Sequence, residues 1–390
     1  MKIINNAGFD KNNTKVLKTE KSFIYKVKDK EDWKYSHHQF LAFFKGRFYA
    51  MWSSGRIHEE FPGQRVMISS SEDAMHWEKP KVLLDVKMGE HIEGTLTAAG
   101  FYVYEGKLNA YIGYYEYQID CMLSLGHALA LKGNVYDNSM DMFPTPTHRN
   151  VTMLIMTSDD GMDFSAPINT KFPVIPNYSP QILKSGRLLI SGNVMFPFTD
   201  DPHGISGWHK TGIYPDSMAD TIFDDSEGLE IVKNIQGWPT HYCEGSFFQM
   251  PDGIINMLLR TGMLNNNSFL YCTRSEDNGE NWSAPFKTEF SNDTSKFHFG
   301  ILPDGRYYYV GNPVVSSGRC PLAISLSKNG IDFDDHYIIE NQNHIKLFEG
   351  MYKGGVYGYP HTLIHEDRMY IIYSLNKESV AISSFLLNEL

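Results

Sequence analysis

The sequence predicts an all-β protein, a β-propeller of six four-stranded sheets, with seven as the alternative count. An apolar and aromatic segment, a short turn and a second such segment recur six times along the 390 residues. The turn positions are Gly46, Gly106, Gly186, Gly253, Gly305 and Asp367. They are 60, 80, 67, 52 and 62 residues apart, so six units of similar size account for the whole chain. A repeat at this spacing is typical of radially arranged sheets.

Each repeated segment predicts a β-hairpin, because glycine supplies the positive φ of a tight turn and the flanks are rich in β-branched and aromatic residues. In chain order the six copies are LAFFKGRFYAMWS, FYVYEGKLNAYIGYY, QILKSGRLLISGN, FFQMPDGIINMLLRT, GILPDGRYYYVGN and LIHEDRMYIIYS. We expect SFIYKVK near the amino terminus to share the last sheet with SVAISSFLL at the carboxyl terminus. Residues 1–390 then form one domain. Two long insertions, 117–150 and 196–240, are expected to build the rim of a pocket.

A second motif, Ser-x-Asp-x-Gly-x-x-Trp, follows the fourth hairpin at residues 275–282 and has altered copies at 71–77, 158–164 and 327–333. Its Ser and Asp side chains can bond backbone groups across a turn, which makes the motif structural. The motif resembles the Asp-box, or BNR repeat, of sialidase-type β-propellers. The resemblance extends from about residue 36 to residue 375 and implies that fold, but it implies little about chemistry.

The composition excludes several classes of function. With 46 acidic and 35 basic residues the formal charge is −11, which argues against a nucleic-acid partner. No apolar run approaches the roughly 18 residues that span a bilayer, so no membrane partner is expected. The amino terminus carries no export signal, so we expect a cytoplasmic protein, or a secreted or periplasmic one if a signal peptide has been removed. The four cysteines form no metal-binding spacing, and we expect neither a metal nor a cofactor.

Histidines recur where the inner strands should begin. His38, His241, His298 and His361 stand in four of the six segments expected to line the centre of the molecule. Imidazole moves protons near neutral pH, so their convergence favours acid–base chemistry. A single buried histidine is more often structural, and a zinc site would require three of them to meet in space.

The first repeat carries a second resemblance. Its SHH segment, its KGR turn and its HExxPGQRV segment are similar to propeller-fold polysaccharide lyases, namely the ulvan lyases and rhamnose–glucuronate lyases, and to a related α-L-rhamnosidase-like group. Those enzymes use a histidine pair on the first sheet, with a Tyr and an Arg, on uronate-containing chains. The resemblance implies catalytic roles for His38 and His58. It places the tyrosine on the second sheet, where Tyr104 is one of four candidates. Arg65 is either a substrate-binding residue or a surface residue of an ordinary strand.

The fourth and sixth repeats resemble sialidase segments. Glu244 and Arg260 match a sialidase Glu at a strand start and an Arg at the end of the next strand, and Tyr359 matches the nucleophilic tyrosine of the last sheet. An arginine can bind a substrate carboxylate with two hydrogen bonds. Glu244 and Arg260 could equally form a structural pair, and Tyr359 could be a stacking platform. Sialidases need arginines on the first and fifth sheets, where this chain has His38 and Lys296 with His298, so the carboxylate clamp is incomplete.

These features favour a carbohydrate-active enzyme that cleaves a glycosidic bond beside an acidic sugar. The leading hypothesis is β-elimination on a uronate-containing oligosaccharide or polysaccharide, with His38 and His58 as base and acid in undecided order and Arg260 on the carboxylate. The alternative is an exo-hydrolase of the rhamnosidase-like or sialidase-like kind, with Glu244 paired to Glu93 or Glu59. A non-catalytic glycan-binding propeller is the third possibility.

Overall fold

The computed structural model describes residues 3–59, 61–90, 92–117, 148–213, 242–261, 268–350 and 352–390, and these ranges are almost entirely β-structure. Short strands near the amino terminus are β1 (Lys15–Val16) and β2 (Glu20–Tyr25). The first sheet contains β3 (Tyr35–Phe44), β4 (Arg47–Gly55), β5 (Arg65–Ser71) and β6 (Lys81–Leu84). The second contains β7 (Thr95–Tyr104), β8 (Lys107–Tyr117), β9 (His148–Ser158) and β10 (Ile168–Asn169).

The remaining strands form four more sheets. The third has β11 (Gln181–Ile182), β12 (Leu188–Leu189) and β13 (Phe198–Thr199). The fourth has β14 (Tyr242–Gln249), β15 (Ile255–Thr261), β16 (Phe269–Ser275) and β17 (Phe286–Ser291). The fifth has β18 (His298–Ile301), β19 (Tyr307–Gly311), β20 (Leu322–Ser327) and β21 (Asp335–Glu340). The last has β22 (Tyr357–His365), β23 (Arg368–Leu375) and β24 (Ser379–Leu386), and the 3-10 helix η3 (Leu387–Glu389) follows it.

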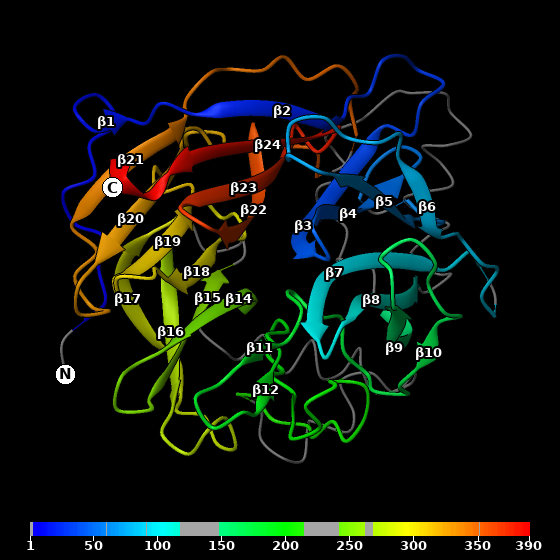
Figure 1. Cartoon of the computed structure of the whole chain (residues 1–390). Coiled ribbons are helices and arrows are strands. Elements are labelled where there is room, and N and C mark those ends of the chain that lie inside the picture. Colours follow the sequence, from blue (N-terminus) through cyan, green and yellow to red (C-terminus); the bar gives the residue numbers. More distant parts are fainter. Residues whose placement is uncertain are drawn as a thin grey trace.

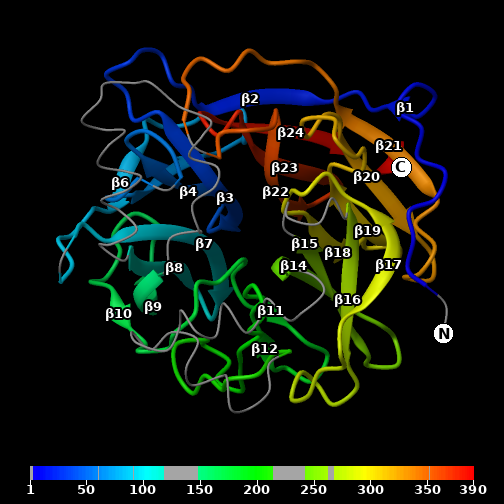
Figure 2. The same cartoon turned by 180° about the vertical axis from the view of Figure 1, so that it is seen from behind.

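The sheets are set around a common centre, and the first strand of each sheet lies innermost (Figure 1). The view from behind shows the same order of sheets around the centre (Figure 2). β2 pairs antiparallel with β24, so the amino-terminal strand completes the last sheet as the sequence predicted. β1 adds a parallel fifth strand to the edge of β21, which was not predicted. This arrangement is the sialidase-like propeller that the repeats indicated.

All six predicted hairpins are formed as antiparallel strand pairs. Their five turn glycines have positive φ, from +76° to +96°, and in the sixth turn Glu366 takes this conformation at φ +54°. The four Ser-x-Asp motifs are turns as predicted. In the full copy the Ser275 hydroxyl donates to Asp277, and the backbone N–H of Gly279 donates to Ser275 Oγ at 2.8 Å. Local chemistry therefore fixes both kinds of turn.

The third sheet differs from the prediction. It has three strands among the described residues, where four were expected. Part of the predicted insertion 196–240 belongs to it, because β13 pairs with β12 and residues 195–212 form two further bridges. Residues 214–240 of this insertion, and 118–147 of the other, lie outside the described residues, so the predicted rim is not tested.

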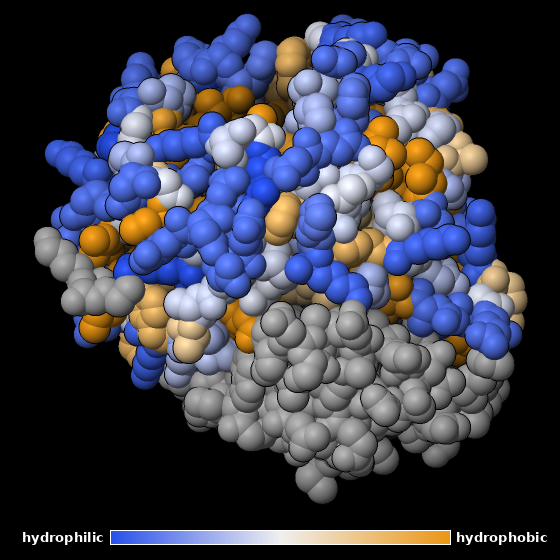
Figure 3. Space-filling view, turned by 90° about the horizontal axis from the view of Figure 1, so that it is seen from below, coloured by the Kyte–Doolittle hydropathy of each residue, from blue (hydrophilic) through white to orange (hydrophobic). Residues whose placement is uncertain are grey.

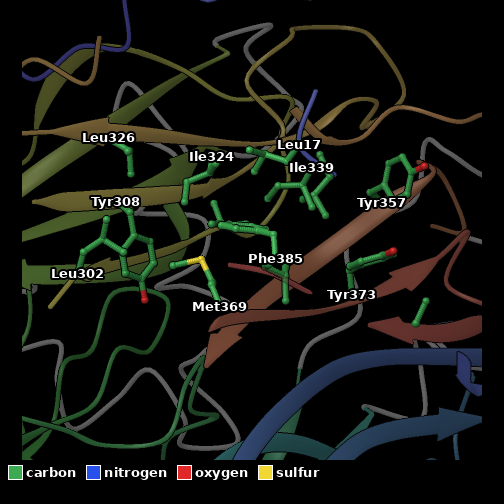
Figure 4. Packing of buried hydrophobic residues seen from close by; sticks show 14 of the residues in the cluster. Leu17, Leu302, Tyr308, Ile324, Leu326, Ile339, Tyr357, Met369, Tyr373 and Phe385 are labelled. Atoms are coloured by element: carbon green, nitrogen blue, oxygen red, sulfur yellow. The ribbon is translucent and has the colours of Figure 1, made fainter. Parts of the chain in front are cut away.

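The core is distributed between neighbouring sheets. Between the fifth and the last sheet, Leu302, Tyr308 and Ile324 face Met369 and Phe385 (Figure 4). The face seen in Figure 3 is mostly hydrophilic outside the grey atoms, with hydrophobic residues in small separate patches. Among the described residues, no helix is long and apolar enough to span a bilayer.

Candidate active site

Three inner strands are irregular at the point where each carries a predicted site residue. The register of β3 shifts between His37 and Phe40, that of β14 between Tyr242 and Gly245, and that of β22 between Gly358 and His361. His38 on β3 and Tyr359 on β22 have φ of +50° and +54°. A bulge redirects side chains, and a positive φ in a bulky residue persists only where the surroundings impose it. The bulges thus direct residues from three sheets toward one place.

Tyr359 and Glu244 are in direct contact at this place. The Tyr359 hydroxyl donates a hydrogen bond to Glu244 Oε1, and Arg260 Nη2 lies 2.6 Å from Glu244 Oε2. Burial raises the pKa of Tyr359 well above its ordinary value, so the phenol is protonated. Burial tends to raise the pKa of Glu244, but the Arg260 charge, the hydrogen bond from Tyr359 and the Lys296 charge together lower it. Glu244 is therefore an ionised acceptor beside a protonated tyrosine.

Four cationic side chains surround the Tyr359 ring. Lys296 Nζ, Lys377 Nζ and Arg319 Cζ each lie 5.6 Å from the ring centroid, and Arg260 Cζ lies 5.8 Å from it. The Thr294 carbonyl accepts hydrogen bonds from Arg260 Nη1 at 2.7 Å and from Arg319 Nη2 at 3.2 Å, which fixes both guanidinium groups. Arg319 Nη1 is buried and has no hydrogen-bond partner among the described residues. Such a concentration of positive charge favours an anionic ligand.

Lys296 lies at the base of this cluster. It is 2 % exposed, its Nζ donates to the Asn177 carbonyl, and Nζ lies 4.1 Å above the centroid of the Tyr178 ring. Burial lowers the pKa of Lys296 to about 7. Its charge therefore varies near neutral pH.

His38 lies at the edge of the Tyr359 ring, with 5.1 Å between centroids. Its Nε2 is 3.7 Å from Glu59 Oε1, and Lys377 forms an ion pair with Glu59 Oε2. Burial lowers the pKa of His38, although Glu59 acts in the opposite direction. Burial also tends to raise the pKa of Glu59, but Lys377 and His38 hold it well below its ordinary range. Glu59 is therefore an ionised residue that orients His38.

One group of residues has the donor atoms for a metal ion. The ligand atoms of His37, His38 and Glu59 lie within 4.8 Å of one another. His37 is fully buried, its Nδ1 is 2.8 Å from Ser374 Oγ, and its Nε2 has no hydrogen-bond partner in the described part of the chain. The Lys377 ammonium already neutralises Glu59, however, and would repel a divalent cation at this position.

The structure does not bring His58 and His38 together as the sequence analysis expected. His58 is 2 % exposed, its ring contacts Phe61, and the Lys353 charge acts on it. The next residue, Glu59, is the one whose side chain reaches His38. In the irregular loop after β4, consecutive side chains point in different directions. Glu59, one residue after the predicted His58, is therefore the residue that contacts His38.

Other predicted site residues lie apart from Tyr359. Tyr104 is at the hairpin end of β7, roughly 30 Å along the strand from its first residue at the rise of a β-strand, and it stacks on Tyr102. Glu93 forms an ion pair with Arg56, with 2.6 Å between Arg56 Nη1 and Glu93 Oε2. Arg65 stacks on Trp33, with its Cζ 3.6 Å from the ring centroid. His241 lies outside the described residues.

His298 and His361 pack together between the inner strands. Their ring centroids are 4.7 Å apart, and His298 Nδ1 is 2.7 Å from Thr362 Oγ1. The backbone N–H of Leu41 donates to His361 Nδ1 at 3.2 Å. These partners hold both rings as neutral packing groups, which is the structural role that the sequence analysis left open.

Sequence reasoning missed Arg319 and Lys377. Arg319 precedes β20, and Lys377 lies in the turn between β23 and β24, whereas the search considered the starts of inner strands. Both have positive φ, +59° and +54°. One feature of the sequence could have indicated Lys377. The turn between β23 and β24 is at the end of the last sheet where β22 begins, so this turn must lie beside the central residues.

The buried histidines predict a stability that decreases in mild acid. Burial lowers the pKa of His298 to about 3 and that of His58 to about 4, from 6.5 in the unfolded chain. Between pH 5 and 6.5 the unfolded state therefore binds more protons than the folded state, and the free energy of unfolding falls as the pH falls. The loss is at most about 1.4 kcal/mol per pH unit for each histidine. Urea unfolding at several pH values measures it, and a His298→Gln variant with an unchanged slope would contradict the assignment.

The comparisons with known proteins agree with this fold. The sequence profile of the BNR repeat-like domain matches residues 46–371. A Dyadobacter fermentans protein of unknown function has a similar structure, with TM-score 0.63 and 15 % identity over 94 % of this chain and 97 % of that one. The structure of a Trypanosoma rangeli sialidase in complex with sialic acid is similar with a TM-score of 0.58 and 9 % identity. The match covers 96 % of this chain and 60 % of that one. The structure of a Penicillium chrysogenum α-L-arabinanase complexed with arabinobiose is similar with a TM-score of 0.53 and 12 % identity. The match covers 96 % of this chain and 99 % of that one. Comparison with curated proteins gave no match.

Proposed function

The chain belongs to the BNR repeat-like family, and on that premise we propose that it hydrolyses a glycosidic bond beside an acidic sugar, with Tyr359 as nucleophile and Glu244 as its base. One observation carries the proposal: the Tyr359 hydroxyl donates to the ionised Glu244 inside a ring of four cations. The names of the structural neighbours, sialidases and an arabinanase, support a sugar substrate.

The first step forms a bond between Tyr359 and the sugar. The phenolic oxygen attacks the anomeric carbon while its proton passes to Glu244. The leaving oxygen receives a proton from the protonated form of His38, which is the minor form near neutral pH because burial lowers the pKa of His38. An uncharged phenol can approach an anomeric carbon beside a carboxylate without the repulsion that a carboxylate nucleophile would meet. Water then attacks the same carbon and gives its proton to His38, and Tyr359 recovers its proton from Glu244 as it leaves.

The two arginines bind the substrate carboxylate in this proposal. Arg260 and Arg319 are held by the same Thr294 carbonyl, and Arg319 Nη1 has no partner in the described residues. Planar guanidinium groups match a carboxylate with paired hydrogen bonds. Arg319, between β19 and β20, thus supplies the arginine of the fifth sheet that the sequence analysis did not find.

Substrate hydrolysis tests the proposal directly. The protein is incubated with 4-methylumbelliferyl glycosides of sialic acid, glucuronic acid, glucose and rhamnose, and the released fluorophore is measured. We expect turnover of at least one acidic glycoside and little or none of the neutral ones. Turnover confined to neutral glycosides, or none with any of them, would contradict the proposal.

Replacing Arg319 with Ala is expected to raise the KM for the acidic glycoside by about 10- to 100-fold, since one charged hydrogen bond to the substrate is lost. Arg306→Ala is the matched control, because Arg306 is in the turn between β18 and β19 and pairs with Asp304. Steady-state kinetics measure both variants. Equal KM values for wild type and Arg319→Ala would exclude Arg319 from binding the carboxylate.

β-Elimination is the second candidate, and one observation favours it. His38, whose pKa is lowered by burial, is a neutral base beside Tyr359, which could protonate the leaving oxygen. The expected partner His58 is not part of this contact. Elimination gives an unsaturated uronate with strong ultraviolet absorbance, whereas hydrolysis does not, so recording absorbance during digestion of uronate oligosaccharides separates the two reactions.

A further inference from the structure

We propose that a second cavity, between the first sheet and β2, binds a single neutral sugar ring. The cavity has a volume of about 190 Å³. This inference does not depend on the chemistry proposed for Tyr359.

The cavity is built by the second and third strands of the first sheet and by the chain that follows β2. Trp52 and Ser54 come from β4, Arg65 from β5, Tyr25 from β2 and Trp33 from the loop after it. Ser54 is paired with Ser36 on β3, two residues before His38. The cavity therefore lies at the same end of the first sheet as the candidate active site, farther from the centre of the molecule.

Two residues that line the cavity carry a buried donor without a partner among the described residues. Trp52 is 1 % exposed, and its indole N–H makes no hydrogen bond with the described residues. Arg65 Nε is likewise buried without a partner, while the guanidinium group is held flat on the Trp33 ring. A buried donor without an acceptor costs about 1–3 kcal/mol, so a water molecule or a ligand that accepts a hydrogen bond from it is favoured. Both donors belong to residues that line the cavity.

The remaining lining residues match the chemistry of a sugar. Tyr25 offers aromatic surface, and its ring stacks on the buried Trp52 ring, with centroids 6.1 Å apart at an angle of 28°. Glu31 and Asp32 supply carboxylate acceptors. Sugar hydroxyls both donate and accept hydrogen bonds, and the C–H faces of the ring pack on aromatic side chains. The volume lies below the roughly 300–1,000 Å³ of sites for drug-sized ligands, so it suits one ring rather than an oligosaccharide.

The charges of the lining residues favour a neutral ring. Glu31 and Asp32 outnumber Arg65, so the cavity has a formal charge of −1 and disfavours a uronate. The Arg65 guanidinium group already makes a cation–π contact with the Trp33 ring, and Arg56 Cζ lies 5.1 Å from the centroid of the same ring. An aromatic cage for an ammonium ligand needs an uncovered ring face. Here two guanidinium groups already lie against the Trp33 ring, so an ammonium ligand is disfavoured.

Binding to the wild-type protein and to variants tests the proposal. The probes are the methyl glycosides of glucose, galactose and rhamnose, with methyl glucuronoside as the charged comparison. Saturation-transfer NMR detects binding, and titration followed by tryptophan fluorescence gives the affinity. Glu244→Gln, which alters the central site, is included so that the two sites are distinguished. We expect at least one neutral glycoside to bind, with the same affinity in Glu244→Gln.

Two variants remove the unpartnered donors. Trp52→Phe keeps most of the ring but removes the N–H, and Arg65→Met removes the guanidinium group. Each is expected to weaken binding by about tenfold or more. Arg47→Met is the control, since Arg47 is at the other end of β4 and pairs with Glu72. Melting temperatures verify folding, and if one variant is unfolded the other decides.

Three results would overturn the proposal. The first is that no neutral glycoside binds. The second is wild-type affinity in folded Trp52→Phe or Arg65→Met. The third is binding that is lost in Glu244→Gln, because the sugar would then occupy the central site.

Discussion

Tyr359→Phe is expected to abolish turnover of the acidic glycoside, with a loss in kcat of about 10⁴-fold or more, because the variant has no nucleophile. The phenylalanine keeps the ring that contacts His37 at a centroid distance of 3.9 Å, so packing changes little. The Tyr359 hydroxyl is also the donor to Glu244, and removal of that donor leaves Glu244 still paired with Arg260. Steady-state kinetics with the 4-methylumbelliferyl substrate measure the loss.

A matched variant and a trapping experiment make this result specific. Tyr308→Phe removes another buried tyrosine hydroxyl, which contacts Thr362 Oγ1 at 2.7 Å, and should retain near wild-type kcat. A fluorinated acidic glycosyl fluoride should label Tyr359, which mass spectrometry of peptides identifies. If Tyr359→Phe retained a tenth of wild-type kcat, or the label formed on another residue, Tyr359 would not be the nucleophile.

The hairpins could be predicted because their determinants are local. A glycine at the turn and apolar or aromatic flanks specify a hairpin within about fifteen residues, as at Gly46. The Ser-x-Asp turns are equally local, since Ser275 and Asp277 bond within their own segment. The hairpin of the third sheet was predicted in the same way, and β11 pairs with β12 as expected. The length of its strands was not predicted, because each strand of this sheet has only two residues.

The site was predictable only where its residues begin inner strands. His38 was identified because a polar residue at the start of an apolar strand requires a reason. Glu244 and Tyr359 were identified because their segments resemble sialidase segments. The roles of Glu59 and Lys377 depend on an ion pair between residues 318 positions apart, which no local pattern encodes. Arg319 depends in the same way on the Thr294 carbonyl.

The bulges explain why the sequence could not assign roles among neighbouring residues. In a regular strand side chains alternate between the two faces, so His37 and His38 would point to opposite sides. In the bulged β3 both rings contact Tyr359, at centroid distances of 3.9 and 5.1 Å. A pattern of alternation therefore cannot say which histidine faces the substrate. The position of Glu59 beside His38 decides it in the structure.

Lys353→Met is expected to lower the free energy of unfolding by about 3–5 kcal/mol, because it leaves a buried carboxylate without its counter-ion. Lys353 Nζ lies 3.0 Å from Glu378 Oε1, and the two side chains are 0 % and 3 % exposed. The Glu378 carboxylate also accepts the backbone N–H groups of Leu347 and Phe348, at 2.9 and 2.7 Å. The pair thus fixes the segment between β21 and β22 against the last sheet. Urea unfolding of wild type and variant measures the difference.

The size of the effect distinguishes a buried ion pair from an exposed one in the same segment. Lys346 lies 2.7 Å from Glu349, with side chains 31 % and 68 % exposed, so Lys346→Met should change stability by at most about 1 kcal/mol. Adding Glu378→Gln to Lys353→Met removes the unpaired charge and should recover part of the loss. If Lys353→Met were no more destabilising than Lys346→Met, the pair would not stabilise this segment. The contact of Lys353 with Glu378 would then be incidental to the packing around His58.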